Sequence, residues 1–207
     1  ADIDYPDLSL KLPSKAKYKT VKFGNNVLIG KNVKIGKNSI IGSNTIIEHD
    51  VIIGSNSIIG SQVILKNSIL GDNVVIQDGC KIGQKGFGFI PLKNKNIKFP
   101  HIGSVIINND VEIASGCTID RGSIDDTEIG KNTYLDNQVH IAHNNKIGDN
   151  CIIAGQVGFA GSSTLGNRVM IGGQAGISGH LKIGNNVQIA GGSGVIKDIK
   201  DNSKVMG

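Results

Sequence analysis

The chain has 207 residues, a formal net charge of +5 at pH 7, 39% hydrophobic and 4% aromatic residues, and no tryptophan. Apolar runs fall short of the roughly 20 residues that span a membrane, and no charged start precedes an apolar segment, so we expect neither a membrane span nor a signal peptide. The positive charge comes mostly from scattered lysines without a basic stripe that contains aromatic residues, which argues against nucleic-acid binding. We interpret these lysines as a solvated surface, although they would also suit an acidic protein partner.

Residues 1–22 form a lead-in segment, after which an apolar residue returns every six positions, usually followed by glycine. This repeat runs from Phe23 to Leu65 and again over residues 129–195. The residue two positions earlier is also small or apolar, which indicates a short strand with one buried face, and the following residues favour tight turns. Three hexads close one triangular coil of eighteen residues, and coils stack about 4.8 Å apart through parallel backbone pairing. We therefore predict an all-β solenoid domain over residues 23–207.

The hexapeptide pattern resembles the left-handed parallel β-helix. The left hand comes from this resemblance, because parallel crossovers are otherwise right-handed. Relatives of this fold form trimers packed side by side, so the resemblance implies a homotrimer. The thin aliphatic core also accommodates Cys80, Cys117 and Cys151 at inward positions, which we interpret as small core residues in a reducing compartment. We accordingly expect a cytoplasmic protein.

The repeat is interrupted at three places. Leu65 to Leu70 is a five-residue step, residues 84–101 carry no repeat, and a shorter irregularity lies within residues 119–129. The long interval contains three of the five phenylalanines, and a loop of this length is uncommon unless it is functional or disordered. Because aromatic residues argue against disorder, we predict a protruding arm at about residues 84–101 that packs on a neighbouring subunit and whose lysines meet phosphates. A packing arm without a ligand role is the alternative.

The most suggestive chemistry lies in the segment VHIAHNN, which contains His140 and His143. His143 falls at a turn, and residues eighteen apart stack on successive coils, so Gly161 and Gly179 should lie along the same edge, with Asp125 approximately on the other side. A histidine can act as a general base that a carboxylate orients. Bare glycines leave a groove in which backbone N–H groups can bind an oxyanion, which suits acyl transfer. The alternative is that His143 and the glycines only serve their turns.

A metal site is the rival use of the histidines, because some trimers of this fold bind zinc through histidines that subunits share. Here His140, His143 and His180 are available. Since His140 and His143 occupy adjacent positions on one edge and diverge, we predict that no metal is bound.

Five segments in order carry a more specific resemblance: IGQKGFGF (82–89), TIDRGSIDDTEIG (118–130), LDNQVHIAHN (135–144), IAGQVGFAGSSTLG (153–166) and GGQAGISGHLKIG (172–184). Together they resemble the UDP-3-O-acylglucosamine N-acyltransferases of lipid A biosynthesis over roughly residues 23–207. The resemblance implies transfer of a 3-hydroxyacyl chain from acyl carrier protein, where it is a 4'-phosphopantetheine thioester, to the 2-amino group of the UDP-linked sugar. It implies no permanently bound cofactor and no covalent acyl-enzyme.

The family's residue roles carry over by motif. The histidine of IAHN is the general base of the family, which implies this role for His143, and Gly161 of the AGS motif would supply an oxyanion N–H. Asp136 of the LDNQ motif competes with Asp125 as the residue that orients the base, and the resemblance favours Asp136. Residues expected to contact substrate or donor are Asn137, His140, Gly179, His180, Phe87 and Phe89.

The sequence departs from the family pattern in two ways, and several other functions compete with N-acyl transfer. Family members usually carry an N-terminal uridine-binding domain and a C-terminal helical extension, and we expect neither here, so either a fragment or a short variant with another acceptor fits the sequence. The HIAH tetrad also occurs in UDP-N-acetylglucosamine O-acyltransferases, but their TIHRG motif reads TIDRG here, which favours N-acylation. An acetyl-CoA-dependent amino-sugar N-acetyltransferase is a further rival. A structural or ice-binding solenoid would display ladders of identical residues, whereas the outward positions here are mixed.

Overall fold

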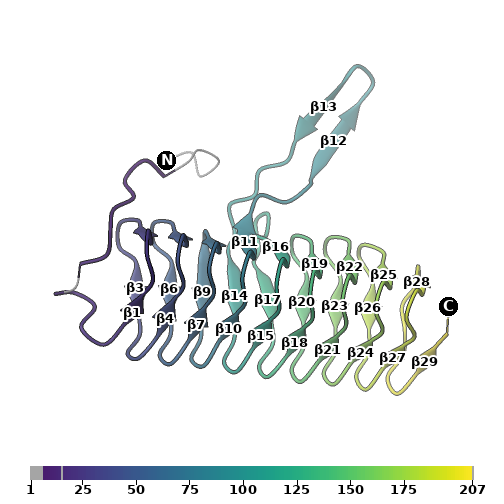
Figure 1. Cartoon of the computed structure of the whole chain (residues 1–207). Helices are drawn as coiled ribbons and strands as arrows, with labels where there is room; N and C mark the ends of the chain where they lie inside the picture. The colour runs from purple at the N-terminus through teal and green to yellow at the C-terminus, as the bar shows by residue number, and fades with distance from the viewer. Residues whose placement is uncertain (1–6, 15, 207) are drawn as a thin grey trace.

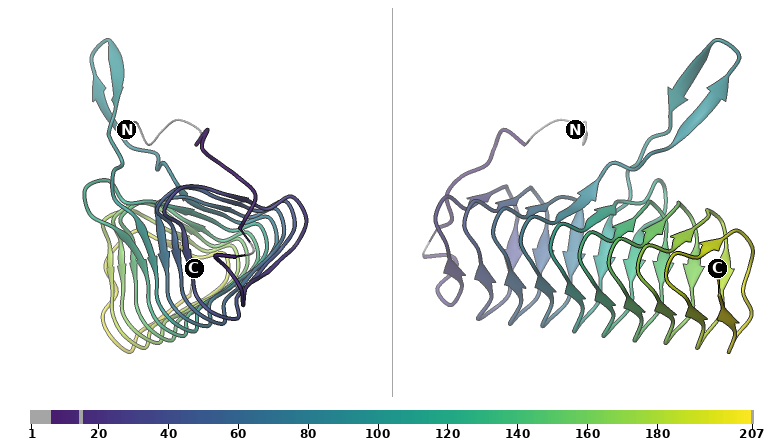
Figure 2. Two further views of the ribbon diagram at one scale, coloured as in Figure 1. Left: turned by 90° about the vertical axis from the view of Figure 1, so that its left-hand side faces the viewer. Right: turned by 45° about the vertical axis from the view of Figure 1, so that its right-hand side comes forward.

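The computed structural model describes residues 7–14 and 16–206, so residues 1–6 and 15 of the predicted lead-in lie outside its described part. The described chain is a triangular prism of about ten stacked coils, a left-handed parallel β-helix (Figures 1 and 2). The predicted all-β hexapeptide solenoid is confirmed. Within the described residues, no helix has the length and the apolar character needed to span a membrane.

Each face of the prism is one parallel sheet, and successive strands of the chain visit the three sheets in turn. The first sheet contains β1 (Lys22–Phe23), β4 (Ile40–Ile41), β7 (Ile58–Ile59), β10 (Val75–Ile76), β15 (Glu112–Ile113), β18 (Tyr134–Leu135), β21 (Ile152–Ile153), β24 (Met170–Ile171), β27 (Gln188–Ile189) and β29 (Lys204–Val205). The second contains β2 (Leu28–Ile29), β5 (Ile46–Ile47), β8 (Ile64–Leu65), β11 (Lys81–Gln84), β16 (Thr118–Asp120), β19 (His140–Ile141), β22 (Gly158–Phe159), β25 (Gly176–Ile177) and β28 (Gly194–Val195). The third contains β3 (Lys34–Ile35), β6 (Ile52–Ile53), β9 (Ser68–Leu70), β14 (Val105–Ile107), β17 (Thr127–Ile129), β20 (Lys146–Ile147), β23 (Thr164–Leu165) and β26 (Lys182–Ile183).

The register between coils follows the repeat of the sequence. Ile141 pairs with Phe159, and Phe159 pairs with Ile177, at the expected spacing of eighteen residues. The inward aliphatic residues form one continuous core, in which all three cysteines are buried. Backbone hydrogen bonds run between coils along the whole prism. Two-residue strands are therefore stable here because the strands between the first and last coils are paired on both sides and all strands cover a shared core.

The corners explain the asparagines of the sequence. The second residue of most turns has a positive φ, for example +57° at Asn150 and +60° at Asn144. Asparagine tolerates this left-handed conformation better than most residues, because its short polar side chain can hydrogen-bond locally. His180 adopts the same conformation, with φ +61°.

The predicted interruptions are all present. Ile53 pairs with Leu70, a spacing of seventeen residues that corresponds to the five-residue step. Ile119 pairs with Ile141, a spacing of 22, which shows that the turn at 121–126 holds four residues more than a regular one. Both irregularities lie at the corner that joins strands of the second sheet to strands of the third. We call this edge the His143 corner, because His143 occupies one of its turns.

The predicted protruding loop also leaves the prism at the His143 corner, between β11 and β14. Its outer part is an antiparallel hairpin of β12 (Phe89–Leu92) and β13 (Lys95–Lys98), which projects away from the coils (Figures 1 and 2). All eight residues of these two strands are exposed. The segment is thus an ordered hairpin, and its predicted packing on a neighbouring subunit stays a prediction.

The lead-in segment covers the first coil. The Tyr18 hydroxyl donates a hydrogen bond to the Val33 carbonyl oxygen at 2.8 Å, and the Tyr18 and Phe23 rings pack edge to face with centroids 5.8 Å apart. Lys11 forms an antiparallel bridge with Ile29. Tyr18 is buried, so the described part of the lead-in shields one end of the core.

Gly83 makes the departure of the arm possible. It has φ +81° at the register shift of β11, and a Cβ there would lie 1.7 Å from the Lys66 carbonyl oxygen. Gly79 has nearly the same φ, +78°, but the nearest atom to its Cβ position is 4.0 Å away. We predict that Gly79→Ala costs about 1 kcal/mol of stability from backbone conformation, and that Gly83→Ala costs several times more because of the additional collision.

Urea unfolding of both alanine variants beside the parent chain measures these two costs. Equal losses would show that the contact with Lys66 relaxes without cost.

Candidate functional site

His143 lies directly over Gly161 at the His143 corner. A Cβ on Gly161 would lie 2.5 Å from Cε1 and 2.7 Å from Nε2 of the His143 ring, so only glycine leaves room for this imidazole. The backbone N–H of Ser162 donates to the His143 carbonyl oxygen at 2.9 Å, and that of His180 donates to the Gly161 carbonyl oxygen at 3.0 Å. The stacking predicted for His143, Gly161 and Gly179 is therefore present.

The neighbouring Asn144 fixes the orientation of the His143 ring. The Asn144 side-chain oxygen accepts hydrogen bonds from the Ser123 backbone N–H at 3.1 Å and the Ser123 hydroxyl at 2.8 Å. Because a backbone N–H can only donate, this atom is an acceptor, and His143 Nδ1, 2.9 Å away, must carry a proton. In the neutral ring, Nε2 then holds the free lone pair, as a general base requires.

Neither of the two carboxylates predicted to orient His143 forms a hydrogen bond with its ring within the described residues. The Asp136 carboxylate lies at a different corner and accepts hydrogen bonds from the backbone and side chain of Asn137. The Asp125 carboxylate lies 3.4 Å from the Lys146 amine, and only the Asp125 carbonyl oxygen contacts Asn144. Within this chain the hydrogen-bond partner of His143 Nδ1 is Asn144, because the four-residue insertion displaces Asp125 from the stacking position. The part of Asp136 in the reaction stays a prediction.

The base of the arm brings a second histidine to His143. The rings of His101 and His143 pack edge to face, with centroids 4.9 Å apart and an interplanar angle of 71°. A Cβ on Gly86 would lie 2.8 Å from His143 Cβ and 2.9 Å from His101 Nε2, and a Cβ on Gly88 would lie 2.8 Å from His101 Cε1. The two glycines of the GFG segment thus leave space for the histidine pair.

Arg121 holds the two ends of the arm together. Its Nε donates to the His101 carbonyl oxygen at 2.7 Å, and one terminal nitrogen donates to the Gly83 carbonyl oxygen at 3.3 Å. The Arg121 backbone N–H donates to the Gln84 carbonyl oxygen at 2.9 Å, and the Arg121 side chain is buried. The arginine of the TIDRG motif therefore acts on the arm, and it fixes where His101 meets His143.

His101 is a buried and neutral imidazole. Its Nδ1 donates to the Phe99 carbonyl oxygen at 3.0 Å, which leaves the lone pair on Nε2. Burial lowers the pKa of His101, and the positive charges of His143, Lys85 and Arg121 act in the same direction, although the hydrogen bond to Phe99 opposes them. His101 Nε2 has no hydrogen-bond partner among residues 7–14 and 16–206.

His140 belongs to a polar cluster on the outward face of the second sheet. Its Nδ1 lies 2.7 Å from the Thr118 hydroxyl, and its Nε2 lies 3.9 Å from an Asp120 carboxylate oxygen. Burial raises the pKa of Asp120 to about 6, although the charges of His140 and Arg121 oppose this effect. The cluster can therefore exchange a proton near neutral pH.

A bare strip continues from His140 along the same face. Gly158, Gly176 and Gly194 occupy the outward positions of the next three strands, and a Cβ on any of them would meet nothing within 4 Å. Side-chain amides border the strip on the side away from His143: Gln156 donates to Gln138 and Gln174 donates to Gln156, each at 2.9 Å. An extended ligand could lie on this strip with one end beside His143 and Gly161.

The remaining predicted residues lie apart from His143. Asn137 is exposed, and its side-chain oxygen accepts a hydrogen bond from Ser115 at 3.1 Å. Phe87 and Phe89 stack edge to face on the arm with centroids 4.7 Å apart, and Phe87 is 84% exposed. His180 is exposed at the corner two coils beyond His143.

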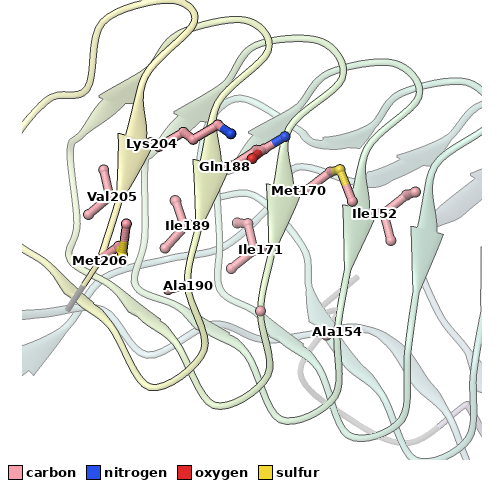
Figure 3. A pocket seen from close by; sticks show the side chains of 11 residues that line it. Ile152, Ala154, Met170, Ile171, Gln188, Ile189, Ala190, Lys204, Val205 and Met206 are labelled. Carbon is pink, nitrogen blue, oxygen red and sulfur yellow. The ribbon is translucent and has the colours of Figure 1, made fainter.

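An apolar groove lies on a different face of the prism from His143. It has a volume of about 510 Å³ and is formed on β21, β24, β27 and β29 of the first sheet, where Ile152, Met170 and Met206 are exposed (Figure 3). No group of three histidine, cysteine, aspartate or glutamate side chains in the described part of the chain is arranged to hold a metal ion.

Sequence reasoning missed His101, Asn144 and Arg121. The arm interrupts the repeat, so counting by eighteen cannot place His101 next to His143. A useful signal was available in the two glycines of the GFG segment, which the turn chemistry of a regular coil does not require. Asn144 could have been found from its position next to the base, because asparagine satisfies the turn and also offers an acceptor.

Comparison with known proteins gives a family match and close partial relatives. The family model described as bacterial transferase hexapeptide (six repeats) matches residues 32–67 and 126–161. A UDP-3-O-acylglucosamine N-acyltransferase from Nitrobacter hamburgensis is 56% identical over 70 residues, which cover 33% of this chain and 19% of that relative. The match thus spans about a fifth of the relative's length.

Solved structures share the fold over most of the chain. The UDP-N-acetylglucosamine acyltransferase from Campylobacter jejuni has a TM-score of 0.77 at 26% identity and covers 86% of this chain and 68% of its own. The UDP-N-acetylglucosamine O-acyltransferase from Moraxella catarrhalis has a TM-score of 0.59 at 30% identity, over 91% of this chain and 68% of its own.

The raised pKa of Asp120 predicts a pH-dependent stability. Its folded pKa, about 6, lies above the ordinary value of 3.8, so between these values the folded chain binds this proton more tightly than the unfolded chain. The stability that Asp120 contributes is therefore present at low pH and is lost as the pH rises through 6. We expect Asp120→Asn to be more stable relative to the parent at pH 7.5 than at pH 5.

Thermal unfolding of the parent and the variant at the two pH values tests this expectation. A difference in midpoint that is the same at both pH values would contradict it.

Proposed function

Because the chain belongs to the hexapeptide-repeat transferases, we propose that it is an acyltransferase of lipid A biosynthesis that acylates the 2-amino group of a UDP-linked 3-O-acylglucosamine. The observation that carries the proposal is the position of the His143 ring over Gly161, with a free Nε2 lone pair beside a bare strip of backbone. The 56% identical relative, which is named an N-acyltransferase, supports the choice of an amine as acceptor.

The proposed reaction needs one base and one oxyanion site. The neutral amine attacks the thioester carbonyl, and His143 Nε2 accepts the proton that the nitrogen loses. The Gly161 N–H, which has no acceptor in the described part of the chain, donates to the oxyanion of the tetrahedral intermediate. When the intermediate collapses, the C–S bond breaks and the thiolate takes the proton back from His143, which leaves an amide and a free thiol.

The donor and the assembly are further parts of the proposal. A 3-hydroxyacyl chain on the pantetheine arm of acyl carrier protein suits the strip of Gly158, Gly176 and Gly194, because a bare backbone floor accommodates an extended chain. Acyl carrier protein is acidic, which suits a chain with net charge +5. We propose a cytoplasmic homotrimer in which the exposed apolar residues of the arm contact a neighbouring subunit.

O-acylation is the second candidate, because the solved structures that share the fold are named UDP-N-acetylglucosamine acyltransferases. The two reactions differ in the bond that they form. Mass spectrometry of products from a panel of acyl donors and sugar nucleotides, before and after hydroxylamine, distinguishes them. Hydroxylamine cleaves any ester, including the 3-O-acyl group that the proposed acceptor already carries, but it leaves an amide intact. The diagnostic group is therefore the newly transferred acyl chain, supplied by an isotope-labelled donor, and its loss on hydroxylamine treatment would replace the N-acyl proposal with the O-acyl one.

Removal of the proposed base is the first test of the mechanism. We predict that His143→Ala lowers kcat about a hundredfold or more, because no other group at this position can take the proton of the amine. His49→Ala is the matched control. His49 occupies the same position in a turn of the same corner four coils away, and it pairs with Asp50 at 2.7 Å as His143 pairs with Asn144.

Steady-state kinetics of both alanine variants, with circular dichroism to verify folding, measures the effect. A near-normal kcat in His143→Ala would remove His143 from the mechanism.

Gly161 provides a second test. In Gly161→Ala the methyl group collides with the imidazole, so we predict a loss of kcat of about a hundredfold from misplacement of the base. In Gly179→Ala the Cβ position lies 3.0 Å from the Gly161 carbonyl oxygen and contacts no imidazole atom, so we expect the donor KM to change more than kcat. Similar kcat values for the two variants would contradict the assigned role of Gly161.

A further inference from the structure

His101 is a buried polar group next to His143 that the proposed mechanism does not use. Its side chain is 2% exposed, and its Nε2 has no hydrogen-bond partner among the described residues. A buried polar atom without a partner costs about 1 to 3 kcal/mol, so an apolar ring of the same shape would pack there at lower cost. Such a cost is characteristic of functional positions.

The unpaired nitrogen lies beside His143. The Cβ position of Gly86 is 2.9 Å from His101 Nε2 and 2.8 Å from His143 Cβ, so these two atoms lie within about 6 Å of each other, and the ring centroids are 4.9 Å apart. The hydrogen bond of Nδ1 to Phe99 fixes which nitrogen carries the lone pair. Arg121 Nε donates to the His101 carbonyl oxygen at 2.7 Å, which holds the backbone from which this ring extends.

We propose that His101 is a positioning residue for His143, and that its unpaired Nε2 stabilises the imidazolium that His143 becomes when it accepts a proton. In a buried site an oriented lone pair favours a neighbouring positive charge more strongly than water-exposed groups do. Burial and the surrounding positive groups, which are Lys85 from the arm, Arg121 from the turn after β16 and His143 itself, keep His101 neutral. The lone pair of His101 is therefore available when His143 accepts a proton.

The role of His101 in turnover rests on the proposed function, but its coupling to His143 is measured without turnover. The experiment is an NMR pH titration of the full chain with ¹⁵N-labelled histidine between pH 5 and 8.5. In the parent chain we expect His101 to keep the Nδ1–H tautomer and to titrate below the ordinary pKa of a histidine. Titration of His101 at or above the ordinary histidine pKa of about 6.5, or a proton on its Nε2 in the neutral ring, would overturn the proposal.

Two variants separate positioning from structural support. His101→Phe keeps the ring shape and removes both nitrogens, so we expect a thermal midpoint at or above that of the parent, a His143 pKa lower by at least about 0.5, and a kcat lower by about tenfold with KM within twofold. His101→Gln keeps a donor for Phe99 and an acceptor, so we expect the His143 pKa and kcat to be close to those of the parent.

An unchanged His143 pKa in His101→Phe, or equal losses of midpoint in both variants, would reduce His101 to a structural residue. If His101→Phe does not fold, the parent titration and His101→Gln decide the question. A parent chain without acyltransferase activity would overturn the proposed function, and the titration would still decide the coupling of the two histidines.

Discussion

Parallel backbone hydrogen bonding between residues eighteen apart is the constraint on which the rest of this structure depends. Strands of two residues have no independent stability, and they persist because the backbone groups of the inner strands pair with the coils on both sides while aliphatic side chains fill the prism. The same pairing fixes the spacing of every side chain along a corner. It therefore converts a distance in sequence into a distance in space, and it places the His143 ring over the backbone of Gly161.

The site arises where this regular pairing is interrupted. The seventeen-residue coil, the arm and the turn at 121–126 all lie at the His143 corner, so the irregular segments meet at one edge of the prism. The arm brings His101 to His143, and the long turn brings Arg121 to the arm and Ser123 to Asn144. In a perfectly regular solenoid these groups would not contact one another, because each residue would lie next to only the equivalent residues of adjacent coils.

In many acid–base sites a single carboxylate both fixes the tautomer of the histidine and stabilises the imidazolium. Here these two tasks fall to different groups around His143. Asn144 fixes the tautomer of the base through a neutral amide, which adds no negative charge near the proposed oxyanion. Asp120 lies on the adjoining face, where burial raises its pKa to about 6. In the proposal for His101, stabilisation of the imidazolium comes from a neutral imidazole in the arm. In this proposal neither group that contacts the base carries a negative charge, which would oppose the oxyanion.

The sequence by itself determined the all-β solenoid, the eighteen-residue register, the inward positions of the three cysteines, the places of all three interruptions and the alignment of His143 with Gly161. These features follow from a local rule, since one inward residue recurs every six positions and short turns leave little freedom between them. Only the tertiary structure decided that residues 84–101 contain a hairpin, that His101 packs on His143 and that Asn144, not Asp136 or Asp125, bonds to its Nδ1. The physical reason is that an insertion ends the eighteen-residue register. Where the chain rejoins the prism is then determined by contacts of Arg121, Gly86 and Ser123. These contacts are long-range and produce no periodic pattern in the sequence.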